Sequence, residues 1–278
     1  FDVPGYIDAL QAYNGTARPG GGTYDFSAAA PVWNPLQSYR VTEDTLAAYV
    51  QANLSGASWS GNVGVRMVNT KTTAQAWDAK ILNIIANGAF NYTAVYDDPS
   101  EVTQDSDYTY FLPSANLSID LMDDLRLRLS AARTMARPSV ETLAPTNTTE
   151  SVSWGEFTQV YGGNADLKPY QADQFDASLE WYFAPSSIFN IAGFYKYIKN
   201  QITTSWEPGV DIGVPGYLFN IIRPINGDHA RVKGVEVGLQ HLFENGFGVR
   251  GQFTRNWSKS YVGDQVRPLE GIAPSVYS

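Results

Sequence analysis

The feature that most constrains this chain is an alternation of apolar and polar side chains over unusually long segments. Apolar residues occupy every second position from Leu46 to Leu54, and the same period recurs in segments 59–69, 108–121, 125–135, 175–183, 189–197, 235–240 and 247–253. A period of two is that of a β-strand with two different faces. The pattern predicts eight strands of roughly ten to fourteen residues. Strands of globular proteins average about five or six residues, whereas a tilted transmembrane strand needs about nine to eleven, so strand length favours a membrane barrel.

The connections between the expected strands alternate between short and long. The short ones are Gly56–Ser58, Met122–Asp124, Ala184–Ser187 and Glu244–Gly246, and the long polar ones lie near 70–107, 136–171 and 199–230. Outer-membrane barrels have tight turns on the periplasmic side and long loops on the outer side. A soluble sandwich has no reason to keep its long loops at one end, so this pattern also favours a barrel. Segment 79–87 suits either a short loop helix or a strand extension.

Composition excludes several classes of protein and site. The formal net charge is −9, which argues against nucleic acid as a partner because phosphate binding needs basic patches. The chain has no cysteine, so disulfide scaffolds, thiolate zinc sites and cysteine nucleophiles are absent. The sequence contains no run of 18 apolar residues that would form a transmembrane helix. It begins at Phe1 without a secretion signal, and we expect a mature or trimmed N-terminus.

A barrel places apolar rows toward lipid and polar rows toward the lumen. The predicted lumen face is polar and carries both signs of charge: Gln51, Arg66, Asp120, Arg126, Arg128, Glu180, Gln240 and Arg250. Aromatic residues gather near the strand ends, where interfacial girdles form. The candidates near short turns are Trp59, Trp181, Tyr182 and Phe183, and those near long loops are Tyr108, Tyr110, Phe111, Trp257 and Tyr261.

One segment carries a family motif. Residues 162–170 read GGNADLKPY and are followed by a long strand, 175–183, that reads FDASLEWYF. This stretch resembles the GNPxLKPE motif of TonB-dependent receptor barrels of the proteobacterial type. Further similar pieces occur in the family's order, among them EDTLAAYVQAN, LPSANL, ARPSVETLAP, VKGVEVGL and LEGIAP. The motif residues are expected to be structural: Gly163, Asn164, Asp166, Leu167, Lys168 and Pro169. Pro169 would set the entry to the long strand, and Gly162 and Gly163 would supply positive φ in a tight loop.

The resemblance implies an all-β fold, in which this chain is part of a large antiparallel transmembrane barrel. Barrels of this transporter type have 22 strands, so residues 1–278 would be a partial barrel domain without the plug and the closing strands. The family implies active import of a scarce nutrient across the bacterial outer membrane, without enzymatic activity and without a cofactor. It also implies three kinds of partner: outer-membrane lipid, a small-molecule ligand, and the TonB–ExbB–ExbD complex acting through a plug and box outside this chain.

Exposed aromatic residues in the long connections are the ligand candidates, because they can stack on a sugar or a siderophore ring. They are Trp154, Tyr161, Trp206 and Tyr217. Ordinary packing within the loops is the competing interpretation of the same residues. Neither His229 nor His241 has a metal-binding spacing, so no metal site is predicted. His241 is expected at a membrane interface.

Two alternatives to an active importer stay open at this stage. A passive porin-like barrel would be complete, free of a plug and shorter in total length. A soluble, carbohydrate-active β-sandwich would have two packed sheets and mixed faces. The ligand, any partner lipoprotein and the oligomeric state are not predicted.

Overall fold

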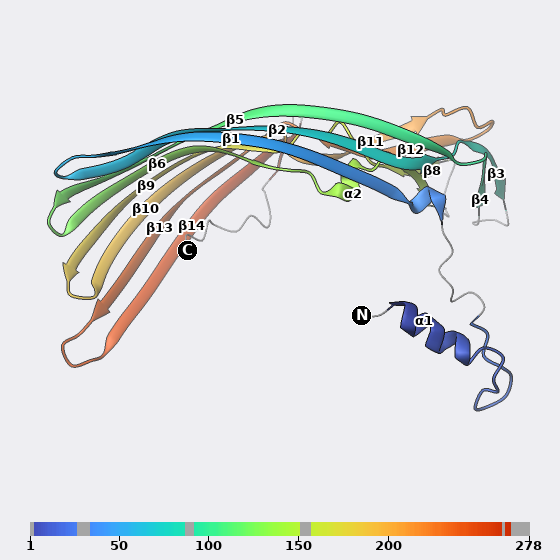
Figure 1. Cartoon of the computed structure of the whole chain (residues 1–278), viewed down its shortest axis with the longest axis horizontal. Helices are drawn as coiled ribbons and strands as arrows, with labels where there is room; N and C mark the ends of the chain where they lie inside the picture. The colour runs from blue at the N-terminus through green and yellow to red at the C-terminus, as the bar shows by residue number, and fades with distance from the viewer. Residues whose placement is uncertain (1–2, 27–33, 87–91, 151–156, 263–264, 268–278) are drawn as a thin grey trace.

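The computed structural model describes residues 3–26, 34–86, 92–150, 157–262 and 265–267. Its main feature is one long, curved sheet of nine antiparallel strands (Figure 1). In spatial order the strands are β1 (Tyr39–Ser55), β2 (Trp59–Asp78), β5 (Ser100–Met122), β6 (Leu125–Ala136), β9 (Tyr170–Ala184), β10 (Ser187–Lys199), β13 (His229–Leu242), β14 (Gly248–Val262) and β15 (Gln265–Arg267). The eight expected strands are therefore confirmed, and β15 extends the sheet at one edge.

The strand pairs that meet at short turns are in the expected places. Gly246, at φ +86°, supplies the left-handed backbone that the turn between β13 and β14 needs. Ser186 takes a similar conformation, at φ 55°, between β9 and β10. Within the described residues β1 and β15 pair with one neighbour each, so the sheet is open at both edges. A single curved sheet of this kind is a section of a barrel wall and not a sandwich of two packed sheets.

The register gives the sheet one apolar face and one polar face. On the apolar face Ile119, Leu127 and Leu179 lie in one row across β5, β6 and β9, and the row continues through Ile191 to Val237. Large apolar side chains on this face are exposed, with Val50 at 68% and Phe253 at 60% of their full accessibility. Exposed apolar rows of this extent match a surface that faces lipid. The apolar face is called the outward face below, and the opposite one the inner face.

Two strands exceed the expected length by the largest margin. β2 has 20 residues and β5 has 23, and they stay paired from Trp59–Ile119 to Asp78–Ser100. The prediction of a long connection over 70–107 is therefore wrong for residues 70–78 and 100–107, which belong to β2 and β5. Strand propensity continues because Thr is frequent in β2 there, and the inner side chains of β2 from Val68 to Ala76 are buried. The remaining link contains the hairpin β3 (Ile81–Ala86) and β4 (Tyr92–Tyr96), which decides the ambiguous segment in favour of a strand.

The other two long connections fold together into a second sheet, called the loop sheet below. Its order is β11 (Ile202–Val210), β12 (Leu218–Asn226), β8 (Phe157–Gly162) and β7 (Asn147–Glu150). β12 and β8 run parallel, although they belong to different connections. Ile84, Val160, Val214 and Phe219 form a buried cluster, so the hairpin β3–β4 packs on the loop sheet. Figure 1 shows these elements at the end of the main sheet that lacks short turns.

The described residues also contain three short helices: α1 (Val3–Ala12), η2 (Pro35–Gln37) and α2 (Val140–Leu143). Figure 1 draws α1 apart from the strands, whereas α2 lies close to the main sheet. No helix among the described residues is long and apolar enough to cross a membrane.

The register corrects part of the predicted aromatic girdle. Tyr110 pairs with Val68, and Tyr108 pairs with the fully buried Thr70, so both tyrosines are on the inner face. Tyr182 also faces inward, where its hydroxyl donates to Glu180 at 2.7 Å. The sequence pattern misplaced these three because it used distance from the strand end and ignored the alternation of faces. The other predicted members occupy outward positions: Trp59, Phe111, Trp181, Phe183, Trp257 and Tyr261.

Candidate functional site

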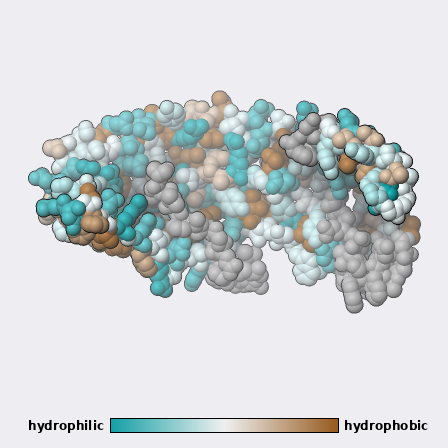
Figure 2. Space-filling model, turned by 90° about the horizontal axis from the view of Figure 1, so that it is seen from below, coloured by the Kyte–Doolittle hydropathy of each residue, from teal (hydrophilic) through white to brown (hydrophobic). Residues whose placement is uncertain are grey.

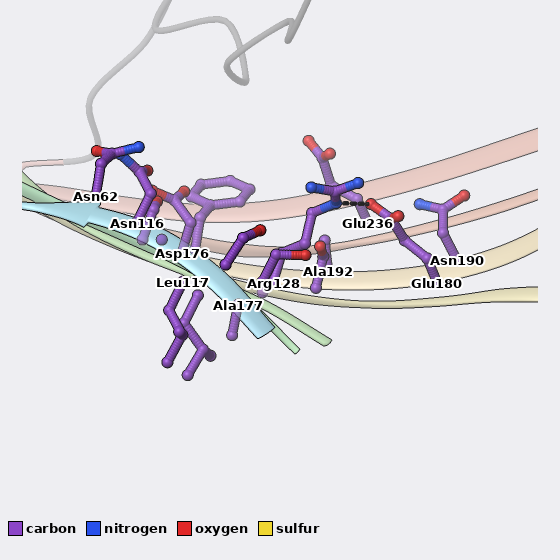
Figure 3. Close-up of a pocket in the computed structure, with 18 of the residues that line it drawn as sticks. Asn62, Asn116, Leu117, Arg128, Asp176, Ala177, Glu180, Asn190, Ala192 and Glu236 are labelled. Carbon is purple, nitrogen blue, oxygen red and sulfur yellow. Dashed lines mark hydrogen bonds and ion pairs between the residues drawn. The ribbon is translucent and has the colours of Figure 1, made fainter. Parts of the chain in front are cut away.

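The inner face of the main sheet forms a polar hollow of about 1070 Å³. Residues from β1 to β14 line it, which makes it a property of the whole curved sheet. In Figure 3 the polar side chains of Asn62, Asn116, Asp176 and Glu180 lie on one side of the strands. Leu117 and Ala177 point to the other side. Viewed from below, the molecule is mostly hydrophilic with smaller hydrophobic patches (Figure 2). The alternating strands thus separate a wet surface from a lipid-facing one.

Charges of both signs meet on the inner face, and Arg128 and Glu180 line the hollow itself. Arg128 Nε donates to Glu180 Oε1 at 2.9 Å, and Arg126 Nε donates to Asp120 Oδ1 at 2.6 Å. These four residues belong to β5, β6 and β9 and were all predicted for the lumen. The side chains of Arg128 and Arg126 keep 47% and 39% of their accessibility, so both pairs are solvated and add little to stability. Their effect is to fix where charge is presented to a solute.

The register places the remaining predicted lumen residues on the same face. Gln51 pairs with Gly64, Arg66 with Tyr49, and Gln240 with Arg250, in rows that alternate with the apolar rows. The predictions for the inner face are therefore consistent with the structure. Sequence reasoning missed other polar residues of the hollow, although the same alternation could have found them: Asn62, Asn116, Ser130, Asp176, Asn190 and Glu236.

Two inner-face glycines lie beneath larger side chains. A Cβ on Gly234 would come within 2.5 Å of the Phe194 ring, and one on Gly238 within 2.3 Å of Asn190 Oδ1. Such contacts are too short for a real methyl group, so the neighbouring side chains lie flat because these positions are glycine. Both glycines therefore lie at points of close packing on the inner face. The glycines keep the wall of the hollow smooth at β13.

The structure separates the four aromatic ligand candidates. Trp206 of β11 and Tyr161 of β8 both pair with Ile222 of β12, so all three share one face of the loop sheet. The two aromatic residues are two strands apart, a separation of roughly 9–10 Å between backbones. Trp206 is 62% exposed, and the Tyr161 hydroxyl bonds to Gln159 at 2.5 Å. Tyr217 instead packs on the buried cluster on the other face. Trp154 lies outside the described residues.

The family motif joins the two long connections. Asn226, at the end of β12, accepts a hydrogen bond from the Lys168 backbone N–H at 2.8 Å and donates one to the Lys168 carbonyl at 2.9 Å. Asn164 donates to the Pro224 carbonyl at 3.1 Å, and its own Oδ1 accepts from the Asp166 N–H. Leu167 is buried and Pro169 fully so. β9 begins at Tyr170, directly after Pro169, as expected.

The predicted reason for the motif's glycines is wrong. Gly162 and Gly163 are not among the residues with positive φ. A Cβ on Gly163 would instead stand 1.9 Å from the Ala144 carbonyl oxygen, so the motif needs glycine for close backbone packing against the residues after α2. Close approach and left-handed backbone are alternative reasons for glycine, and sequence alone does not distinguish them.

The two histidines lie in aromatic surroundings. His229 stacks on Tyr261 with ring centroids 4.4 Å apart, and His241 lies 4.3 Å from Phe243 with an edge-on ring. His241 also bonds through Nδ1 to Ser187 at 2.8 Å, next to a short turn. The described residues contain no group of three or more His, Cys, Asp or Glu side chains that could hold a metal ion.

Comparison with protein families gives one match over nearly the whole chain. The family model described as TonB dependent receptor-like, beta-barrel, matches residues 5–278. No curated protein matches the chain.

Solved structures show a similar fold at low identity. The hemophore receptor HasR of Serratia marcescens, solved with its hemophore HasA and heme, is 13% identical over 78% of this chain and 34% of that one, with a TM-score of 0.58. The ferric-catecholate import receptor Fiu of E. coli K12 is 18% identical over 80% and 28%, with a TM-score of 0.51. The copper transporter OprC is 13% identical over 79% and 30%, also at 0.51. The chain spans about a third of the length of the solved chains it matches.

Proposed function

Because the chain belongs to the TonB-dependent receptor family, with residues 5–278 in its β-barrel domain, we propose that it forms part of the wall of an active importer. The family consists of transporters of the bacterial outer membrane and not of enzymes. The proposed cargo is a scarce small molecule: an iron–siderophore complex, cobalamin or an oligosaccharide. The single observation that carries the proposal is the separation of faces, with a mixed-charge inner hollow behind an exposed apolar face.

The loop sheet is the proposed site of first contact with the ligand. Trp206 is exposed, shares its face with Tyr161, and belongs to one of the long connections. A flat ring of a ligand can stack on such a surface. Tyr217 and Trp154 remain candidates for the same role. The motif residues, from Gly163 to Pro169, are proposed to hold this sheet in place through Asn226.

Transport would draw energy from the TonB–ExbB–ExbD complex through a plug and box that belong to the complete protein. The mixed charges of the inner face suit a wet interface with such a plug, since solvated ion pairs can exchange partners at little cost. A porin-like barrel would instead pass solutes passively. Dependence on TonB therefore separates the two functions.

The test uses the complete protein in its own outer membrane. The detergent-extracted fraction should contain a heat-modifiable band well above the 30.6 kDa of this chain. Uptake of labelled ferric siderophores, cobalamin and oligosaccharides should then be measured with and without TonB. The proposal expects uptake of one class, lost without TonB and weakened at least several-fold by Trp206→Ala. Phe253→Ala, on the outward face, is the matched control. Uptake that persists without TonB would establish a passive barrel, and a soluble 30.6 kDa species would overturn the membrane assignment.

A further inference from the structure

Basic side chains gather on the outward face of the later strands, at the ends away from the short turns. Alternation and register place six of them on this face, in β6, β10, β13 and β14: Arg133, Lys199, Arg231, Lys233, Arg255 and Lys259. Asp173 is the carboxylate in the same rows, and it pairs with Arg133 at 2.6 Å and with Lys199 at 3.2 Å. The other four cations are exposed, and no ion pair is found for them among the described residues. A chain of net charge −9 thus carries a concentrated positive patch.

The earlier strands present a different outward surface at the same end. There the outward cations are Arg40 and Lys71. The register places four carboxylates in nearby outward positions of β1 and β5: Asp44, Glu101, Asp105 and Asp107. Lys71 lies directly between Asp44 and Asp107. The positive patch is therefore specific to the later strands and does not run around the whole wall.

Aromatic rings hold the arginines of the patch close to the sheet. The Arg231 guanidinium lies 5.5 Å from the Tyr261 ring and 5.7 Å from the Tyr197 ring, and that of Arg255 lies 5.3 Å from the Trp257 ring. A guanidinium on an aromatic face keeps its N–H donors free for an anion at the edge. Interfacial aromatic residues also mark the level of the lipid headgroups.

A hollow of about 760 Å³ adjoins the patch on its membrane side. It exists because small residues, Ala131, Ala177 and Gly193, occupy neighbouring positions on three strands. Larger apolar side chains border it, and Lys233 and Trp257 are at the end nearest the patch. Its lining is thus mostly apolar, with a cation at one end, which is the arrangement that an acyl chain below a phosphate requires.

We propose that this surface binds one phosphorylated glycolipid of the outer leaflet, with an acyl chain in the hollow and phosphates on Arg231, Lys233, Arg255 and Lys259. The leaflet follows from the membrane orientation proposed above, on which this inference rests. From Arg255 to Lys259 the strand rises about 13 Å, so the cations extend farther than a single headgroup phosphate. A sugar headgroup with two separated phosphates neutralises more of them, and this favours a glycolipid over an ordinary anionic phospholipid. Each cation–phosphate contact would be charge-assisted and therefore stronger than a hydrogen bond between neutral groups.

The charge part of the proposal is tested on the complete receptor, purified in detergent and freed of lipid. Native mass spectrometry would measure binding of diphosphoryl lipid A, with phosphatidylglycerol and phosphatidylethanolamine as competitors. The double variant Lys233→Gln, Arg255→Gln should lower lipid A binding at least tenfold. Lys71→Gln, which removes a cation from the same face outside the patch, should leave it unchanged. Equal lipid A binding by the double variant would overturn the proposal, and so would equally tight binding of phosphatidylglycerol.

The hollow is tested without changing charge. Ala177→Phe should fill it and weaken lipid A binding at least severalfold, whereas Ala48→Phe, an outward alanine of β1, should not. An unaltered affinity in Ala177→Phe would show that no acyl chain enters the hollow. Nutrient uptake is measured on the same variants to keep the two proposals apart. If the wild-type receptor does not bind lipid A but shows TonB-dependent uptake, this inference alone is refuted. If it binds lipid A but shows no TonB-dependent uptake, only the proposed function is refuted.

Discussion

The main sheet and the loop sheet obtain their stability in opposite ways. Every neighbouring pair among the first eight strands of the main sheet is antiparallel, and four of these seven pairs are simple hairpins. Its large apolar side chains point outward and stay exposed, Leu46 by 70% and Phe253 by 60%. The loop sheet pairs strands from two separate connections, in parallel, and buries Phe219 completely. The first sheet needs lipid as its apolar environment, whereas the second builds a small core of its own.

This difference implies that mutations should affect the two regions independently. Replacing an outward apolar side chain of the main sheet exchanges contact with detergent or lipid and leaves no internal cavity. Replacing a buried side chain of the loop sheet removes packing that nothing else supplies. Barrel formation and loop order are therefore separate measurements.

Phe219→Ala is expected to have the largest effect. The side chain is fully buried against Ile84, Val160 and Val214, and a buried Phe→Ala change costs about 3–5 kcal/mol. Hydrogen exchange of the complete receptor should show the loop sheet and β3–β4 losing protection. The barrel should keep its heat-modifiable band. Phe253→Ala, on the outward face, should leave both readouts near wild type, and simultaneous loss of the barrel in Phe219→Ala would contradict the independence of the two sheets.

Gly163→Ala tests the close contact between the family motif and the backbone after α2. The new methyl group would meet the Ala144 carbonyl, so the backbone must move, at a cost of about 1–3 kcal/mol. Limited proteolysis should cleave the segment around α2 faster, and uptake should fall in proportion to the loss of loop order. Gly251→Ala is the control, because nothing lies within 4 Å of a Cβ there. A wild-type cleavage rate in Gly163→Ala would mean that the close approach is relaxed in the receptor.

The sequence predicted what depends on local pattern. The strands of Leu117, Leu127 and Leu179, and the faces of these side chains, were predicted because side chains in a strand alternate. The tight turns predicted which strands are neighbours in the sheet. It did not predict what depends on distant partners. The pairing of β12 with β8 joins residues about sixty positions apart, and Tyr217 packs on a cluster drawn from three connections. The burial that keeps β2 in a strand as far as Asp78 likewise comes from segments elsewhere in the chain.

Asn226→Ala should cost less than Phe219→Ala and about as much as Gly163→Ala. The side chain exchanges two hydrogen bonds with the Lys168 backbone and donates a third to the Asn200 carbonyl at 3.3 Å. At about 0.5–1.5 kcal/mol for each good bond, the loss is about 1–3 kcal/mol. Local exchange rates at residues 166–170 should rise by roughly tenfold or more. Asn62→Ala, which removes one exposed amide contact to Asn116, should change exchange little in either sheet. If Asn62→Ala and Asn226→Ala changed exchange at residues 166–170 equally, Asn226 would not be the link between the long connections.

Arg128→Met should have the smallest effect on stability and, for that reason, gives the clearest information about transport. The ion pair with Glu180 is solvated, so its removal costs about 0–1 kcal/mol and leaves the sheet intact. The change nevertheless leaves Glu180 as an uncompensated charge in the middle of the inner hollow. If anionic ligands or an acidic plug surface pass this point, uptake should slow while barrel formation and loop exchange stay at wild-type values. Arg126→Met, one pair closer to the short turn, is the matched variant. Identical uptake kinetics in both variants and wild type would show that the ion pairs serve the wall and do not contact the transported ligand.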